Sequence, residues 1–169
     1  MAAPGLRPFL PSDAPVLAAL FRASVARLAE DYYDDDQLAA WASAVDDEAA
    51  FAARLTRNLT IVALVGGEIA GFASLEGGGV VDLLYVRPDH ARQGVGAALA
   101  NAIEKLAGAR GAGKLTVEAS DAARDFFAAR GYEAQQRSMR ALGDEWLGAT
   151  TMTKALAPAA QHSAPGTPQ

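Results

Sequence analysis

Residues 85–106, YVRPDHARQGVGAALANAIEKL, pass from β-branched and aromatic residues through two glycines into a helical pattern. Gly94 and Gly96 have no Cβ, so the backbone of this turn can fold tightly and expose its N–H groups. A helix that begins near Val95 places the positive end of its dipole at the same point. The stretch therefore predicts an anion site, most naturally for a phosphate or pyrophosphate, although a G-x-G turn alone is also typical of a plain helix start.

The patterns on either side of this turn predict an α+β fold with a central, mostly antiparallel sheet of about six or seven strands and helices on both faces. Strand 79–88, helix 94–111 and strand 114–120 form a unit that requires one parallel pair. Glycines 66 and 67 predict a two-residue hairpin turn. The remaining expected strands are 6–10, 59–65, 68–76, 132–142 and 148–156, and the remaining expected helices are 11–33, 34–45, 47–57 and 121–131. We expect a single domain over 1–156 and a disordered tail over 157–169, which is rich in Pro, Ala and Gly.

Composition excludes several classes of function. The chain of 169 residues has a formal net charge of −5 and no basic stripe, which argues against nucleic acid and anionic membranes. It has no cysteine and only two histidines, so we expect no disulfide, no cysteine nucleophile and no metal site. The N-terminus lacks the pattern of a signal peptide, and no apolar run approaches the roughly 20 residues that span a bilayer. A cytoplasmic location is the expectation.

The sequence contains two partial matches to nucleotide-binding motifs, and each lacks a required residue. A dinucleotide fingerprint requires Gly or Ala where GVGAAL has Leu99, and it requires a doubly wound parallel sheet. The stretch GARGAGKL, residues 108–115, matches G-x-x-x-x-G-K but has Leu115 where a magnesium-binding Ser or Thr is needed. We interpret the second stretch as the end of a helix and the loop that follows it.

The chain resembles the GCN5-related N-acetyltransferase family over nearly its whole length. The centre of the resemblance is DLLYVRPDHARQGVGAAL, which is similar to the family's acyl-CoA motif Q/R-x-x-G-x-G/A at the start of a helix. VEASDAARDFFAARGYE is similar to the family's strand–helix segment that ends in Gly-Phe, and the order of elements agrees as well. One position departs, because Ala91 stands where the motif begins with Gln or Arg, and Arg92 and Gln93 follow it.

The resemblance implies acetyl-CoA as cosubstrate. The pyrophosphate is expected on the backbone amides of residues 92–97, with added charge from Arg92, and the pantetheine on the backbone of Leu84 and Val86, where two parallel strands part. Phe126 and Phe127 are expected to flank the pantetheine, and Ser120 takes a position where relatives often have Asn. The full expected cofactor-binding set is Leu84, Tyr85, Val86, Arg92, Gln93, Gly94, Val95, Gly96, Ala97, Ser120, Ala123, Phe126 and Phe127.

Acetyl transfer to an amine needs a proton acceptor and a proton donor. Strict alternation along VVDLLYVRP places Asp82 on the face of Leu84 and Val86, so Asp82 is the first candidate for the base and Glu118, on the neighbouring strand, the second. Each carboxylate also has a purely structural interpretation. A backbone N–H near Leu84 or Val86 is expected to stabilise the oxyanion.

The proton donor is missing from its usual place. Many relatives have a tyrosine where this chain has Phe127, and a phenyl ring cannot donate a proton. Either water assists the leaving thiolate, or Tyr85 or Ser120 takes over. Tyr132 is expected in the core.

For the acceptor pocket we expect Tyr32 and Trp41, from EDYYDDDQLAAW, as substrate-binding residues. The acidic residues of this stretch either form a rim that favours a cationic amine or simply begin a helix. The resulting hypothesis is an acetyl-CoA-dependent N-acetyltransferase of a small-molecule amine, as a monomer or homodimer. The alternatives are a protein or peptide N-acetyltransferase, or a non-catalytic acyl-CoA sensor, which Phe127 favours.

Overall fold

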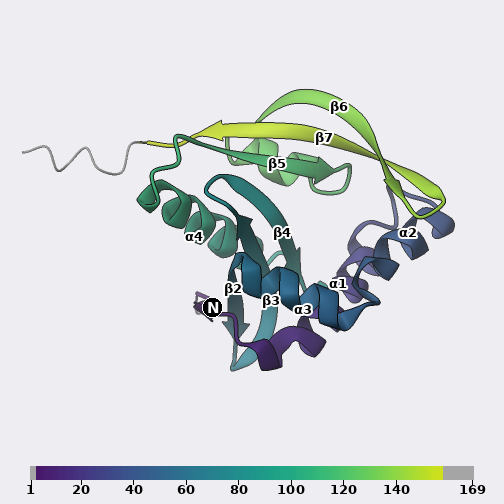
Figure 1. Ribbon diagram of the computed structural model, residues 1–169, viewed down its shortest axis with the longest axis horizontal. Helices are drawn as coiled ribbons and strands as arrows, with labels where there is room; N and C mark the ends of the chain where they lie inside the picture. The colour runs from purple at the N-terminus through teal and green to yellow at the C-terminus, as the bar shows by residue number, and fades with distance from the viewer. Residues whose placement is uncertain (1–2, 158–169) are drawn as a thin grey trace, which may run out of the picture.

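A seven-stranded sheet forms the centre of the molecule, with helices packed on both faces (Figure 1). The structure is a computed structural model that describes residues 3–157, so nearly all of the expected tail lies outside the described residues. The strands are β1 (Gly5–Pro8), β2 (Leu59–Val65), β3 (Glu68–Glu76), β4 (Val80–Val86), β5 (Lys114–Ser120), β6 (Glu133–Leu142) and β7 (Glu145–Ala155). The helices are α1 (Ala14–Leu28), α2 (Asp35–Ala42), α3 (Glu48–Arg57), α4 (Val95–Ala109) and α5 (Arg124–Ala129). The predicted fold class is confirmed.

The sheet has the order β1-β2-β3-β4-β5-β7-β6, and every neighbouring pair is antiparallel except β4 and β5. The right-handed β-α-β rule places α4 across one face between these two parallel strands. The β2–β3 turn is at Gly66 and Gly67, which have φ angles of 59° and 82° as a hairpin of this length requires.

Each face of the sheet has its own hydrophobic core. On one face, Leu99 and Ile103 of α4 pack on β3 and β5. On the other face, α1 and α3 cover β2 and β3, with Phe72 at the centre. Gly71 of β3 allows α4 to approach the sheet, because a Cβ there would lie 2.9 Å from the Val95 side chain.

The strands β4 and β5 are paired only at their beginning. Val80 faces Thr116 and Val81 faces Val117, and the two strands part beyond that point. The separation starts at a bulge in β4. Val81 and Leu83 pair with consecutive residues of β3, and Asp82 between them has no partner there. A bulge bends its strand and increases the local twist. The bulge at Asp82 therefore lies at the point where β4 and β5 separate.

The N-terminus of α1 is fixed by a side chain that does not cap the helix. Asp13 accepts two hydrogen bonds from Arg7, at 2.8 and 3.0 Å, and one from the Leu10 backbone N–H at 2.8 Å. The Arg7 guanidinium lowers the pKa of Asp13 below its ordinary value. This pair ties β1 to the start of α1.

Candidate active site

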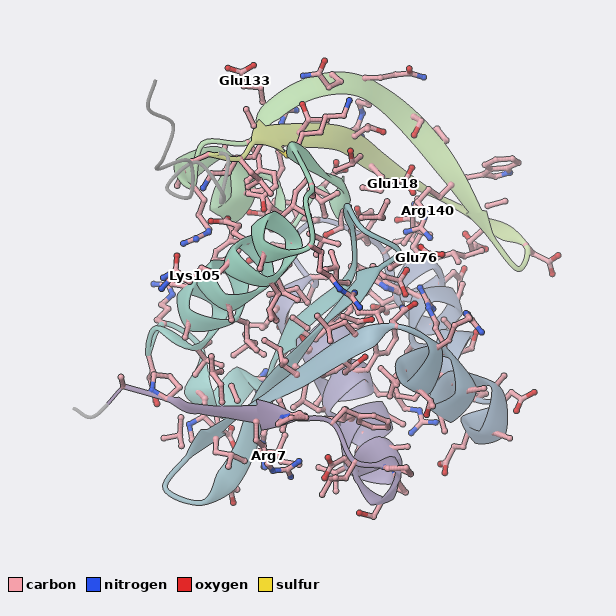
Figure 2. All side chains as sticks on the ribbon, turned by 60° about the vertical axis from the view of Figure 1, so that its left-hand side comes forward. Arg7, Glu76, Lys105, Glu118, Glu133 and Arg140 are labelled. Atoms are coloured by element: carbon pink, nitrogen blue, oxygen red, sulfur yellow. The ribbon has the colours of Figure 1, made fainter. Side chains whose placement is uncertain are left out.

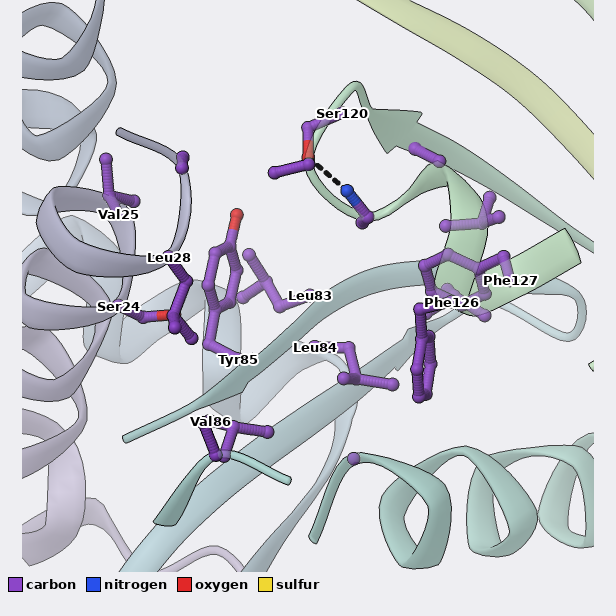
Figure 3. Close-up of a pocket in the computed structure, with 18 of the residues that line it drawn as sticks. Ser24, Val25, Leu28, Leu83, Leu84, Tyr85, Val86, Ser120, Phe126 and Phe127 are labelled. Atoms are coloured by element: carbon purple, nitrogen blue, oxygen red, sulfur yellow. Dashed lines mark hydrogen bonds between the residues drawn. The ribbon is translucent and has the colours of Figure 1, made fainter. Parts of the chain in front are cut away.

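A cavity of about 440 Å³ lies where β4 and β5 part. It opens to both faces of the sheet: α4 and α5 border it on one side, and α1 and α2 on the other. In Figure 3, Leu84 and Val86 lie toward Phe126 and α4, whereas Tyr85 lies toward Leu28 of α1. We call the α1 and α2 side the acceptor chamber. The predicted site residues that line the cavity are Trp41, Asp82, Leu84, Tyr85, Val86, Arg92, Gly94, Gly96, Ala97, Glu118, Ser120, Ala123, Phe126 and Phe127.

The turn before α4 forms a cradle of backbone donors. Arg92 and Gly94 have φ angles of 64° and 82°, the left-handed conformation that turns successive N–H groups toward one side. Within the described part of the chain, the N–H groups of residues 92–97 donate to no protein acceptor. The helix dipole of α4 adds positive potential at this point. The structure thus has the tight glycine turn and the free N–H groups that the proposed anion site requires.

Two residues of the cradle do not line the cavity with their side chains. Val95 is 1% exposed and packs in the core, so only its backbone is available to a ligand. The Gln93 side chain turns back to the loop, with its Oε1 3.2 Å from the His90 ring and its Nε2 donating to the Asp89 carbonyl. Gln93 therefore supports the turn from outside the cavity.

The backbone of β4 presents free groups to the gap. The Arg87 N–H donates to the Ala70 carbonyl of β3, so the groups of Tyr85, two residues earlier, also face β3. By alternation, the N–H and C=O groups of Leu84 and Val86 point toward β5, which has moved away. These are the groups that the resemblance assigns to the pantetheine and the oxyanion.

Asp82 does not share a face with Leu84 and Val86, so this part of the sequence-based interpretation was wrong. The bulge shifts the alternation, and Asp82 turns toward α3. Its oxygens accept hydrogen bonds from Arg54 Nε and Nη2, both at 2.7 Å, and from Asn58 Nδ2 at 2.9 Å. The Asp82 side chain is 14% exposed. Three donors thus hold the Asp82 oxygens toward α3.

Glu118 has a more open environment. Its Oε1 lies 3.0 Å from Arg140 Nε, and the two side chains are 43% and 46% exposed. Figure 2 shows them side by side, from β5 and β6. Both line the cavity in the acceptor chamber.

The Tyr85 hydroxyl points into the cavity (Figure 3), beside Trp41, whose indole N–H can only donate to it and so leaves the phenol proton unshared. Burial raises the pKa of Tyr85 to about 12, although Trp41 and two arginines act in the opposite direction. The phenol is therefore protonated at neutral pH. By contrast, Ser120 Oγ accepts a hydrogen bond from the Ala123 N–H at 3.2 Å, which leaves its own proton free. Phe127 is 4% exposed and packs against Tyr132, which is buried as expected.

Tyr32 and Trp41 have different positions. Trp41 lines the acceptor chamber, with its ring edge-on to Tyr85 at a centroid distance of 6.4 Å. Tyr32 is 52% exposed and lies outside the lining, which corrects its expected position. The buried neighbour is Tyr33, whose hydroxyl donates to the Gly148 carbonyl and accepts from the Asp121 N–H. The acidic residues beside them begin α2, where Asp34 caps the helix, and they do not line the cavity.

Sequence reasoning missed the arginines that neutralise both carboxylates. Arg54 is on α3 and Arg140 on β6, and no local pattern links either residue to its partner. Over residues 3–157, no helix is long and apolar enough to cross a bilayer, and no group of three His, Asp or Glu side chains is placed to hold a metal ion.

Comparisons with known proteins agree with this geometry. Residues 29–156 match the family model of the acetyltransferase (GNAT) domain. The chain is 33% identical over 135 residues to YafP of Escherichia coli strain K12, described as an uncharacterized N-acetyltransferase, a match that covers 78% of this chain and 84% of YafP.

Solved structures include a similar protein from Rhodopseudomonas palustris, described as a GCN5-related N-acetyltransferase, "Aminotransferase, Class-II". Its TM-score is 0.91 at 56% identity, with coverage of 92% of this chain and 98% of that chain. PaiA N-acetyltransferase from Thermoplasma acidophilum, solved in complex with coenzyme A, has a TM-score of 0.76 at 15% identity, with coverage of 91% and 99%. The second likeness shows a shared fold.

Proposed function

The chain belongs to the GNAT acetyltransferase family and is an N-acetyltransferase, and from this premise we propose that it transfers the acetyl group of acetyl-CoA to the amine of a small molecule. The nitrogen attacks the thioester carbonyl directly. The observation that carries the proposal is the continuity of three features: the cradle before α4, the parted strands and the acceptor chamber. The cytoplasmic location expected from composition stays a prediction.

The chain has suitable groups for the pyrophosphate and for the pantetheine of acetyl-CoA. The amides of residues 92–97 suit the pyrophosphate, because unpaired N–H groups at a helix N-terminus favour an anion. The exposed Arg92 adds a positive charge at the same edge. The free backbone groups of Leu84 and Val86 suit the amides of the pantetheine, with Ala123, Phe126 and Phe127 as its apolar wall.

Two side chains are suited to the proton transfers. Tyr85 holds an unshared proton over the cavity, and it is our candidate for the donor to the leaving thiolate in place of Phe127. Glu118 is our candidate for the acceptor of the amine proton, directly or through water, because its one partner within residues 3–157 is an exposed arginine. Asp82, the first candidate from the sequence, is better suited to holding the bulge of β4 against α3. An N–H of Leu84 or Val86 faces the position of the oxyanion.

A small acceptor fits the volume better than a protein chain. The cavity of about 440 Å³ must hold the end of the pantetheine as well as the acceptor. Helices α1 and α2 cover the acceptor chamber with Val25, Leu28 and Trp41. These walls leave room for a compact molecule, whereas a peptide substrate needs an open groove.

The test combines coenzyme binding with turnover. Calorimetry with CoA and acetyl-CoA measures the first, and the release of free thiol from acetyl-CoA with a panel of small amines measures the second. We expect micromolar or tighter binding and amine-dependent thiol release. Binding without thiol release for any amine would favour the non-catalytic sensor, and the absence of binding would overturn the proposal.

A further inference from the structure

The acceptor chamber contains one ion pair that is suited to exchange its partners. Arg140 Nε lies 3.0 Å from Glu118 Oε1 as an ion pair. Within residues 3–157, neither side chain makes a hydrogen bond, either to the other or to a third group. Exposed pairs of this kind are individually weak, so a ligand that offers both charges can replace the contact at small cost.

The ion pair that Asp82, in the cavity wall, forms with Arg54, outside the lining, is different. Arg54 and Asp82 meet through two hydrogen bonds of 2.7 Å, and Asn58 adds a third. A two-pronged arginine–carboxylate contact is geometrically fixed, and here the carboxylate is only 14% exposed. It neutralises Asp82 without offering a free charge. In the acceptor chamber this leaves Glu118 as the group for a cation and Arg140 as the group for an anion.

We infer that the acceptor is a zwitterion, a small amine that carries a carboxylate or similar anionic group close to its nitrogen, recognised by exchange of the Glu118–Arg140 pair. The inference rests on the proposed function. The ammonium group of the acceptor replaces Arg140 at Glu118, and its anion replaces Glu118 at Arg140. A simple amine takes only the first position and leaves Arg140 without a partner in the cavity, which costs affinity.

The same exchange prepares Glu118 for its proposed role. An acceptor that draws Arg140 away leaves Glu118 next to the ammonium group that must lose a proton. Most of the remaining wall is apolar or aromatic, with Leu28, Leu83 and Trp41, and Ser24 adds a hydroxyl. The molecules that fit are therefore amino acids with an apolar or aromatic side chain.

The experiment uses matched acceptors. L-Leucine is compared with L-leucinamide and isoamylamine, and L-phenylalanine with L-phenylalaninamide and phenethylamine, each as acceptor with acetyl-CoA. We expect kcat/KM for the acid to exceed that of both analogues at least tenfold in at least one series. Equal values, or a preference for the amines in both series, would overturn the inference while leaving the proposed function intact.

Two variants assign the preference to the pair. Arg140→Gln should lower kcat/KM for the acid at least tenfold relative to that for the matched amine, so that the preference for the acid falls below about threefold. Arg137→Gln is the matched control, because Arg137 is on the same strand and is paired with Asp121 outside the cavity. It should keep the wild-type preference. A preference that survives in Arg140→Gln would overturn the inference.

A binding measurement covers the case in which no acceptor is acetylated. Calorimetry of the CoA-bound protein with the same six compounds should then show tighter binding of the acid than of its analogues, with loss of the difference in Arg140→Gln. That result would support the zwitterion site on a sensor. Binding of none of the six compounds, or of the amines alone, would overturn it.

Discussion

Replacing Gly96 with alanine tests where the arm of the coenzyme passes. A Cβ at this position would lie 3.3 and 3.4 Å from two ring atoms of Phe126 and 3.7 Å from a methyl group of Val86. These side chains line the cavity beside the cradle, so the new methyl group narrows the passage between cradle and gap. Gly108 is the matched control, because it is on the same helix and a Cβ there would meet no atom within 4 Å.

The two variants should differ in their effects on thermal stability and on CoA affinity. In Gly108→Ala, the helix gains roughly 0.5–1 kcal/mol, which raises Tm by about 1–4 °C for a chain of this size. In Gly96→Ala, the tight contact with Phe126 offsets this gain, so Tm should stay within about 2 °C of the wild type. CoA affinity should fall about 5- to 150-fold in Gly96→Ala, since overfilling a packed site costs about 1–3 kcal/mol.

Thermal unfolding and calorimetry with CoA, at one ionic strength, measure both effects. Gly108→Ala should bind CoA like the wild type. If Gly96→Ala also binds CoA within twofold of the wild type, the arm does not pass between Gly96 and Phe126, and the placement of the pantetheine is wrong.

Three further variants test single contacts. Tyr85→Phe should lower kcat about 10²-fold or more without changing CoA affinity. Because burial raises the pKa of Tyr85 to about 12, the wild-type enzyme should keep this proton donor beyond about pH 10. A loss of wild-type kcat near pH 10 that is absent in Tyr85→Phe would contradict this. Arg54→Met leaves Asp82 without its main partner and should reduce the free energy of unfolding by about 1–3 kcal/mol in urea, whereas a loss below about 0.5 kcal/mol would show that the pair is not structural. Asp13→Asn removes a carboxylate whose pKa Arg7 lowers, so the variant should be less stable than the wild type by the full amount above about pH 4, and by less as the pH falls through the pKa of Asp13 in the folded state. A difference in urea midpoint between the two proteins that stays constant down to about pH 2 would refute the assignment.

The sheet and the cradle could be predicted because local patterns carry them. The glycines at 66 and 67 specify a hairpin turn whatever surrounds them, and Gly94 specifies a left-handed residue directly before a helix. The parallel pair follows from the length of the segment between its strands. These features depend on neighbours in sequence, and the structure has them where the patterns place them.

The surroundings of the carboxylates could not be predicted, because they depend on distant residues. The bulge at Asp82 reverses the alternation for the rest of β4, and a single extra residue leaves no mark in a pattern of period two. Arg54 and Arg140 reach the site from other elements. Tyr32 and Tyr33 are adjacent, so only the packing of the segment after α1, with Ala29 and Tyr33, against Leu147 of β7 decides which of them is buried.

The balance of charge in the acceptor chamber has a kinetic consequence. Each carboxylate there faces an arginine, so the chamber has little field of its own inside a protein with a formal net charge of −5. A dipolar ion without net charge is not drawn in from a distance, and its rate of arrival is set by diffusion and orientation. Discrimination between acceptors then depends on their dissociation rates, and non-cognate molecules are those that dissociate fastest.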